Sequence, residues 1–167
     1  MLRARQDLSA NDHRAALTTA FASADTFIKG LAEAMYDRVT DPSSWLPFAD
    51  TRSTLESLHG HGLLVGVVSN IGFDIRTVFS HHGLIDLIDT FALSFEHGIT
   101  KPDPALFEVA TSAMGVLPTE TIMVGDNIAD AGAVRAGMRA YLLPPVASGS
   151  PRRLGEILKL CVGPDIW

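Results

Sequence analysis

The sequence predicts an α/β protein with a Rossmann-like parallel sheet and helices on both of its faces. Short runs of β-branched and other apolar residues, "LLVGVVSN" at 63–70 and "TIMVGD" at 121–126, are typical of strands buried on both sides. Helical patterns separate these runs, and strands that alternate with helices form parallel sheets. The 167 residues, 47% of them hydrophobic, are enough for one domain with a sizeable core.

The first half of the chain is predicted to be mostly helical. Between residues 13 and 38, apolar side chains recur in steps of three and four, which indicates one amphipathic helix or two in tandem. Two prolines in "TDPSSWLPFAD" end this pattern. Asp50 or Thr51 can then cap the next helix, which is predicted to end near His59. After the first strand, we expect a helix over about 73–82.

The second half is predicted to continue the alternation. "TFALSF" at 90–95 is typical of a strand, and "HGITKPDP" is typical of a loop. Pro102 and Pro104 lie before or at the first turn of a helix predicted over 104–114. The elements predicted to follow are the strand over 121–126, a short helix over 131–136, a strand over 139–144 and a last helix over 152–160.

The composition argues against several classes of protein. A net charge of −6 and a pI near 5.4 argue against binding to nucleic acid or acidic membranes through a broad basic surface. No apolar run approaches the roughly 18 residues of a bilayer-spanning helix, and the N-terminus lacks the apolar run of a signal peptide. Cys161 is the only cysteine. We therefore expect a cytoplasmic protein with no nucleic acid or membrane partner.

Polar residues follow three of the predicted strands. Ser69 and Asn70 end the first strand, Lys101 lies in the loop after the second, and Asp126 ends the third. Ligands bind at the carboxyl ends of parallel strands. A serine hydroxyl with the backbone N–H groups after it can hold an anion, and a lysine stabilises charge on transferring oxygens. A carboxylate is a suitable ligand for Mg²⁺.

These residues, in this order, resemble the haloacid dehalogenase-like (HAD) hydrolase superfamily. "VVSN" is similar to its second motif, with Ser69 in the phosphate-binding position and Asn70 beside it, and "GITKPDP" is similar to its third, with Lys101 as the charge-stabilising lysine. "VGDNIADAGAVRAGM" is similar to its fourth motif, which implies Asp126 and Asp130 as acids of an Mg²⁺ site. An acid at Asp126, where dehalogenases have a different pattern, favours a phosphatase with a small phosphorylated substrate.

Two interpretations of Asp130 are open. As part of the fourth motif, it is the second acid of the metal site. Alternatively, its side chain caps the helix predicted to begin at Ala131, because aspartate is among the favoured N-cap residues. Only three residues separate Asp126 from Asp130, a spacing that occurs in the superfamily.

One motif of the superfamily is not found in this sequence. Members begin with a strand that ends in D-x-D, whose first aspartate attacks phosphorus, and no aspartates ahead of "VVSN" have that spacing. Residues 1–45 resemble part of a helical cap, and residues 46–167 resemble the core without its first strand. In the superfamily that strand lies between the "VVSN" and "MVGD" strands. We therefore interpret the sequence as truncated, with a gap of about 9–10 Å between those strands, unless another segment or another chain fills it.

Two functions follow from the resemblance. The first is Mg²⁺-dependent hydrolysis of phosphate monoesters by the full-length parent protein, with no appreciable turnover by this chain. The alternative is a non-catalytic protein that uses Ser69, Lys101 and Asp126 to bind a phosphorylated ligand or a partner protein. An incomplete cap would leave the apolar stripe around Phe27 and Ile28 partly uncovered, which would favour a homo-oligomer.

Overall fold

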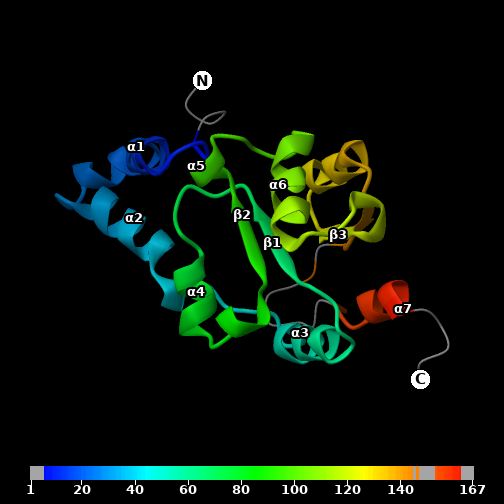
Figure 1. The fold of residues 1–167 in the computed structure, drawn as a ribbon. Helices are drawn as coiled ribbons and strands as arrows, with labels where there is room; N and C mark the ends of the chain where they lie inside the picture. The colour runs from blue at the N-terminus through cyan, green and yellow to red at the C-terminus, as the bar shows by residue number, and fades with distance from the viewer. Residues whose placement is uncertain (1–5, 145, 147–152, 163–167) are drawn as a thin grey trace.

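The computed structural model describes residues 6–144, 146 and 153–162 (Figure 1). The first half contains α1 (Ala10–Phe21), η2 (Ala22–Thr26), α2 (Leu31–Thr40), η3 (Pro42–Ser44), α3 (Thr51–Gly60), β1 (Gly66–Ser69) and α4 (Arg76–His81). The second half contains η4 (Ile85–Leu87), β2 (Thr90–Leu93), α5 (Ser94–His97), α6 (Pro104–Met114), η5 (Pro118–Glu120), β3 (Ile122–Gly125), η6 (Ile128–Ala136), β4 (Arg139–Leu142) and α7 (Glu156–Val162). The elements labelled η are 3₁₀ helices.

The strands form two parallel pairs. β1 pairs with β2, with Val67 opposite Phe91, and β3 pairs with β4, with Met123 opposite Ala140. The predicted α/β class with parallel strands is therefore confirmed. Within the described residues, β1 and β3 are not hydrogen-bonded to each other, so the sheet is split into two. The expected width of the gap between the "VVSN" and "MVGD" strands, and the missing strand inferred from it, stay predictions.

Helix α6 connects the two strand pairs through the apolar core. Leu106 is fully buried and packs in one cluster with Ala92 of β2. Phe107, the next residue, is fully buried in a second cluster with Ala133 of η6. Val68 of β1 packs against both clusters. Full burial of a leucine or phenylalanine side chain contributes roughly 1.5–3 kcal/mol, so α6 supplies much of the apolar contact between the two halves.

Helices cover both faces of the β1–β2 pair. Side chains alternate along β2, so Ala92 faces α6 while Phe91 faces the other way. Phe79 of α4 packs there against Phe91, with ring centroids 5.2 Å apart. Figure 1 shows α4 and α6 on opposite sides of these two strands. The prediction of helices on both faces is confirmed for this pair.

The N-terminal region contains two packed helices, so the tandem alternative is the correct one. Ser9 caps α1 through its side chain. Gly30 separates the helices with a φ of 84°, a conformation that glycine adopts readily. The proposed cap boundary at residue 45 follows η3, where the Trp45 indole N–H donates to the Val39 carbonyl over 2.8 Å. The division into a cap at 1–45 and a core at 46–167 stays a prediction.

The predicted strand over 90–95 is too long. β2 ends at Leu93 because Ser94 begins the short helix α5. The Ser94 side chain is fully buried, and its hydroxyl accepts a hydrogen bond from the Ile71 amide over 2.9 Å. This contact turns the chain away from the sheet.

Two helix predictions also need correction. The helix predicted over 73–82 begins only at Arg76, because the Asp74 carboxylate accepts the Arg76 amide and holds the preceding residues in a turn. The last helix begins at Glu156 rather than at 152. Residues 151 and 152 lie outside the described part of the chain.

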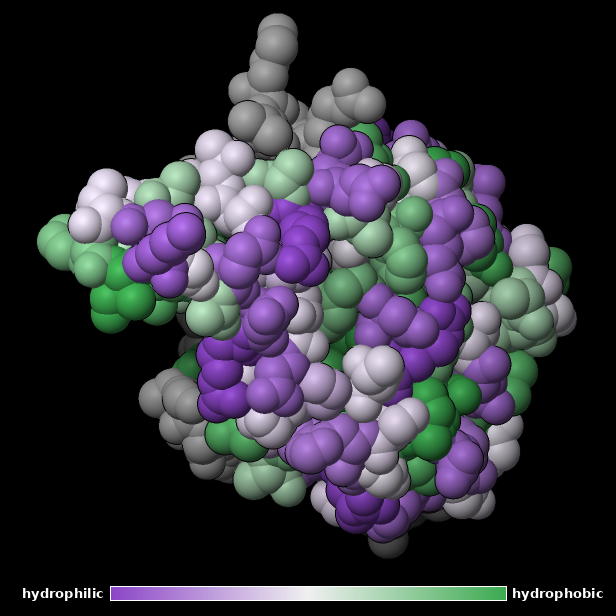
Figure 2. Space-filling model, turned by 90° about the vertical axis from the view of Figure 1, so that its left-hand side faces the viewer, coloured by the Kyte–Doolittle hydropathy of each residue, from purple (hydrophilic) through white to green (hydrophobic). Residues whose placement is uncertain are grey.

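The surface offers no membrane-spanning element: no helix among the described residues is long and apolar enough to cross a bilayer. Figure 2 shows polar and apolar side chains interspersed over the face that carries α1, α2 and α4. Phe27 and Ile28, between η2 and α2, are 85% and 62% exposed. Part of the apolar stripe noted in the sequence is therefore on the surface.

Candidate active site

The candidate residues lie where β1 and β3 end. Ser69 is the last residue of β1 and Asn70 follows it, while Asp126 directly follows β3. Lys101 comes from the loop between α5 and α6, and Asp130 comes from η6. The residues belong to segments far apart in the sequence, and a set of hydrogen bonds joins those segments.

Lys101 connects the two strand ends. Its Nζ donates to the Val68 carbonyl of β1 over 2.8 Å and to Oδ1 of Asp130 over 2.7 Å. The side chains of Lys101 and Asp130 are only 12% and 4% exposed. A lysine ammonium has three donors, so one N–H remains for a further acceptor at this edge.

Asn70 positions the loop that carries Lys101. Its side-chain Oδ1 accepts the Lys101 amide over 2.7 Å, and its Nδ2 donates to the Lys101 carbonyl over 2.9 Å. These two bonds resemble the paired hydrogen bonds between neighbouring strands, with the side-chain amide of Asn70 in the place of one strand's backbone. Asn70 is thus a positioning residue in this structure, and its amide is occupied by the loop.

Asp130 organises the turn after β3. Its Oδ2 accepts the amides of Asp126 and Asn127, over 3.1 and 2.9 Å, while its Oδ1 accepts Lys101. The helix begins at Ile128, and Asn127 is its N-cap, with Asp130 three residues later in a capping box. The interpretation of Asp130 as the N-cap of a helix starting at Ala131 is therefore wrong.

Two glycines of the fourth motif allow this close packing. A Cβ on Gly125 would lie 2.1 Å from Oδ2 of Asp130, so a side chain there would displace the carboxylate. A Cβ on Gly132 would lie 2.6 Å from the Pro102 carbonyl oxygen. Gly132 therefore lets η6 approach the backbone next to Lys101. The motif glycines bring the lysine and the acid together.

Ser69 and Asp126 face a less crowded environment. Asp126 is exposed, and Ser69 is partly exposed. Within the described part of the chain, the Ser69 hydroxyl has no hydrogen-bond partner. An exposed carboxylate and an available hydroxyl, beside a fixed ammonium group, form an edge suited to an oxygen-rich ligand.

The donor set fits Mg²⁺ through one carboxylate better than through two. Among the described residues, no three histidine, cysteine, aspartate or glutamate side chains are grouped to hold a metal ion. Mg²⁺ binds through one or two carboxylates and keeps water and phosphate oxygens as its other ligands. Asp126 is exposed at the end of β3, whereas Asp130 is buried and both of its oxygens accept hydrogen bonds.

A second polar cluster near this edge was missed in the sequence. Ser94 holds the Ile71 amide, and His13 of α1 is buried against Gly72, with its Nδ1 3.5 Å from the Tyr36 hydroxyl. Burial lowers the pKa of His13, partly opposed by Asp7. Ser94 directly follows β2 and Ser69 is the last residue of β1, so both lie at a strand end, and the rule that identified Ser69 could have identified Ser94 too.

The fold and these contacts define an α/β protein with an ionic site at the carboxyl ends of its parallel strands. Residues 6–143 match the sequence model of the family described as haloacid dehalogenase-like hydrolases. The chain therefore belongs to this family, and the resemblance drawn from the motifs is confirmed.

Relatives with phosphatase names are among the proteins similar to this chain. Haloacid dehalogenase-like hydrolase domain-containing protein 3 of Danio rerio is 35% identical over 115 residues, 68% of this chain and 48% of that protein. Phosphatase MT3486 of Mycobacterium tuberculosis (strain CDC 1551 / Oshkosh) is 38% identical over 100 residues, 58% of this chain and 46% of that protein. A crystal structure of a HAD phosphatase from Thermococcus onnurineus is similar with a TM-score of 0.64 and 28% identity, covering 75% of this chain and 62% of that one. The chain spans about half the length of the curated relatives it matches.

Proposed function

We propose that this site binds the phosphate group of a small phosphorylated molecule together with Mg²⁺. The observation that best supports the proposal is the fixed ammonium group of Lys101, held between Val68 and Asp130 beside an available serine hydroxyl. Because a phosphate is an anion with several acceptor oxygens, it suits one remaining lysine donor and the Ser69 hydroxyl. Phosphatases among the relatives support the same class of ligand.

Each residue has a distinct part in this proposal. Ser69 donates its hydroxyl to a phosphate oxygen, and Lys101 stabilises negative charge on the same group. Asp126 is the direct carboxylate ligand of Mg²⁺, while Asp130 keeps Lys101 and the turn after β3 in place. When bound, the metal would neutralise charge on the phosphate. The proposed reaction of the full-length parent is hydrolysis of a phosphate monoester.

We propose that this chain binds phosphate without appreciable turnover, a result that the non-catalytic alternative also predicts. Hydrolysis through a covalent intermediate needs an attacking carboxylate. Four of the aspartates ahead of Ser69 instead accept other hydrogen bonds: Asp25, Asp41 and Asp50 accept the amides of Ala32, Ser43 and Leu154, and Asp12 accepts the Ser9 hydroxyl. None of these four follows a strand.

The test is a pair of measurements on the same preparation. Binding is followed by thermal unfolding with inorganic phosphate, with Mg²⁺, and with both. Turnover is followed with p-nitrophenyl phosphate and Mg²⁺, and 2-chloropropionate is the substrate for the dehalogenase comparison. We expect stabilisation that is largest with both ligands and no hydrolysis of either substrate.

Matched variants distinguish the loss of a ligand contact at the site from a general change in the charge of the protein. Lys101→Met and Asp126→Asn should abolish the stabilisation, whereas Lys29→Met and Asp86→Asn change the same charges on exposed residues and should leave it intact. A well-folded protein that neither ligand stabilises would refute the binding proposal. Phosphate ester turnover lost in Asp126→Asn would show that an attacking group exists, and the non-catalytic alternative would be wrong.

A further inference from the structure

Ser94 lies where three segments of the chain meet. β2 ends at Leu93, opposite Ser69 of β1, so Ser94 follows directly beyond the paired strand ends. Its side chain is fully buried. The hydroxyl accepts the Ile71 amide over 2.9 Å, and its one proton has two carbonyl acceptors within reach, those of Ile71 and Asp7. Asp7 belongs to the segment before α1, so this hydroxyl contacts the N-terminal region as well as the loop after β1.

The segment from Ser94 to Lys101 is held at both of its ends by two consecutive residues. At one end, the Ser94 hydroxyl accepts the Ile71 amide. At the other end, the Asn70 side chain forms two hydrogen bonds with the Lys101 backbone. Hydrogen bonds thus close the segment into a ring against Asn70 and Ile71. A shift of Ile71 relative to Ser94 therefore changes the distance that the segment must span to bring Lys101 to Asn70.

This segment has little structure of its own to keep it in place. α5 spans only Ser94–His97, and helices of so few residues are not stable in isolation. Gly98 then turns the chain with a φ of 64°. An ion pair also holds α5, but its partners Arg76 and Glu96 have side chains that are 34% and 32% exposed, so water weakens it. The fully buried hydroxyl of Ser94 is the more specific anchor.

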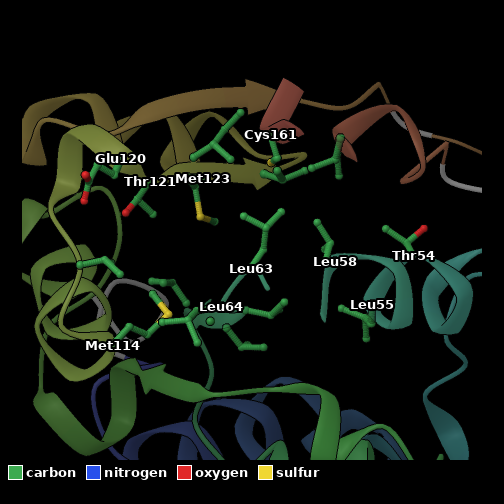
Figure 3. Close-up of a pocket in the computed structure, with 18 of the residues that line it drawn as sticks. Thr54, Leu55, Leu58, Leu63, Leu64, Met114, Glu120, Thr121, Met123 and Cys161 are labelled. Carbon is green, nitrogen blue, oxygen red and sulfur yellow. The ribbon is translucent and has the colours of Figure 1, made fainter. Parts of the chain in front are cut away.

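Hydrogen-bonded support for the end of β1 comes from the β2 side. Among the described residues, β1 pairs with one strand, β2. On another side it borders a largely apolar hollow of about 560 Å³, whose walls include residues 65–68 and 122–124 (Figure 3). Residues 69–71 come next along the chain and do not line this hollow. The contacts of Ser94 and Lys101 therefore fix the residues just beyond β1, where the candidate phosphate site lies.

We infer that Ser94 is a positioning residue of the phosphate site, which acts through Ile71 and Asn70 on Lys101. Loss of its hydroxyl leaves the buried Ile71 amide without its acceptor, and an unpaired buried donor is costly. The loop after β1 should then shift to find another partner, and Asn70 should carry the Lys101 backbone with it. This inference rests on the proposed function, because the part that it gives Ser94 is to keep the Lys101 ammonium group where phosphate binds.

The first measurement is phosphate binding by the full chain, followed by isothermal titration calorimetry with inorganic phosphate in the presence of Mg²⁺. In metal sites, loss of a residue that orients a ligand weakens affinity about 10–100-fold, and we expect Ser94→Ala to weaken phosphate binding about tenfold. The matched control is Thr111→Val. It removes another buried hydroxyl, which bonds to carbonyls of its own helix α6, and should leave phosphate binding unchanged.

The second measurement distinguishes positioning from a general loss of stability. Hydrogen exchange by NMR follows the Lys101 backbone amide and the Asn70 side-chain amide, which bond to each other's residue rather than to Ser94. Exchange at both should be about tenfold faster in Ser94→Ala, because the local opening that exposes them becomes easier. The amide of Ala110, in the buried core, reports any general loss of stability. In Thr111→Val, exchange at Lys101 and Asn70 should change no more than at Ala110.

Two results would overturn the inference. The first is phosphate binding by Ser94→Ala that equals binding by the unaltered chain. The second is exchange at Lys101 and Asn70 that speeds up no more than at Ala110, which would indicate a merely structural role. No phosphate binding by the unaltered chain would instead refute the proposed function, and the exchange data would still decide whether Ser94 positions Lys101. If Ser94→Ala does not fold, Ser94→Cys, whose thiol is a weak acceptor, takes its place in both measurements.

Discussion

The buried pair of Lys101 and Asp130 gives the sharpest test of the site geometry. Removal of one partner from a buried ion pair costs ~3–5 kcal/mol, because the other charge stays buried without compensation. We expect Lys101→Met to lower the free energy of unfolding by an amount near the lower end of this range, because Asp130 keeps two backbone N–H donors. Asp130→Asn should lower the free energy of unfolding more, because the asparagine oxygen can accept either Lys101 or the two backbone amides, while its NH2 group can accept neither. The double variant removes both charges, so its loss of unfolding free energy should be clearly smaller than the sum of the losses in the two single variants.

Urea unfolding followed by circular dichroism measures the free energies for this double-mutant cycle. We expect a coupling energy of at least ~2 kcal/mol. With m-values of ~1–3 kcal/mol/M, a 3 kcal/mol loss moves the midpoint by about 1–3 M. If a single variant is unfolded in buffer, trimethylamine N-oxide restores a measurable transition for all members of the cycle.

The exposed pair of Arg52 and Glu56 is the control cycle. Its atoms are 3.5 Å apart, and both side chains are more than half exposed. Such pairs contribute ~0.3–0.5 kcal/mol. Arg52 also donates to two backbone carbonyls, but those contacts cancel in the cycle. A coupling for Lys101 and Asp130 no larger than this control would refute the reasoning.

Three further predictions follow from particular contacts. Gly132→Ala places a methyl group against the Pro102 backbone and should cost ~1–3 kcal/mol in urea unfolding and weaken phosphate binding; Gly60→Ala, which meets nothing within 4 Å, should do neither. His13 has its pKa lowered by burial from an ordinary value of 6.5, so the unfolded state binds more protons below that pH. Its contribution to stability is fully present above about pH 6.5 and is lost as the pH falls toward the folded pKa; urea titrations at several pH values should show this slope flattened in His13→Gln. Phe27→Ser should reduce any self-association, measured by light scattering after size-exclusion chromatography, and a mass unchanged by this variant would count against an interface at this stripe.

The positions of the candidate site residues could be predicted because they follow from a rule of parallel sheets. Ser69 and Asp126 stand at strand ends, where neighbouring strands bring their last residues to one edge. The sequence also indicated Lys101, although it lies in a loop, because "GITKPDP" is similar to the third motif of the family. Their roles in binding stay predictions, while their placement at one edge is what the structure shows.

Other features depend on contacts that no local pattern reveals. The segment 90–95 has a strand-like composition, yet Ser94 leaves the sheet because its hydroxyl binds Ile71, which lies 23 residues away. The start of η6 is set by Asn127 and by the fit of Asp130 against Gly125, a contact between residues that sequence periodicity does not resolve. Periodicity over residues 13–38 predicts one helix or two, but it does not place the break at Gly30.

The site and the split sheet are physically connected. β1 and β3 share no hydrogen bonds, yet their ends are held together because Lys101 bonds to Val68 on one side and to Asp130 on the other. Asp130 in turn fixes the Asp126 amide at the end of β3. The same ion pair that shapes the candidate phosphate site therefore also joins the carboxyl ends of the two strand pairs. Its loss should separate the strand ends as well as weaken ligand binding, so the two effects should appear together in every variant that breaks it.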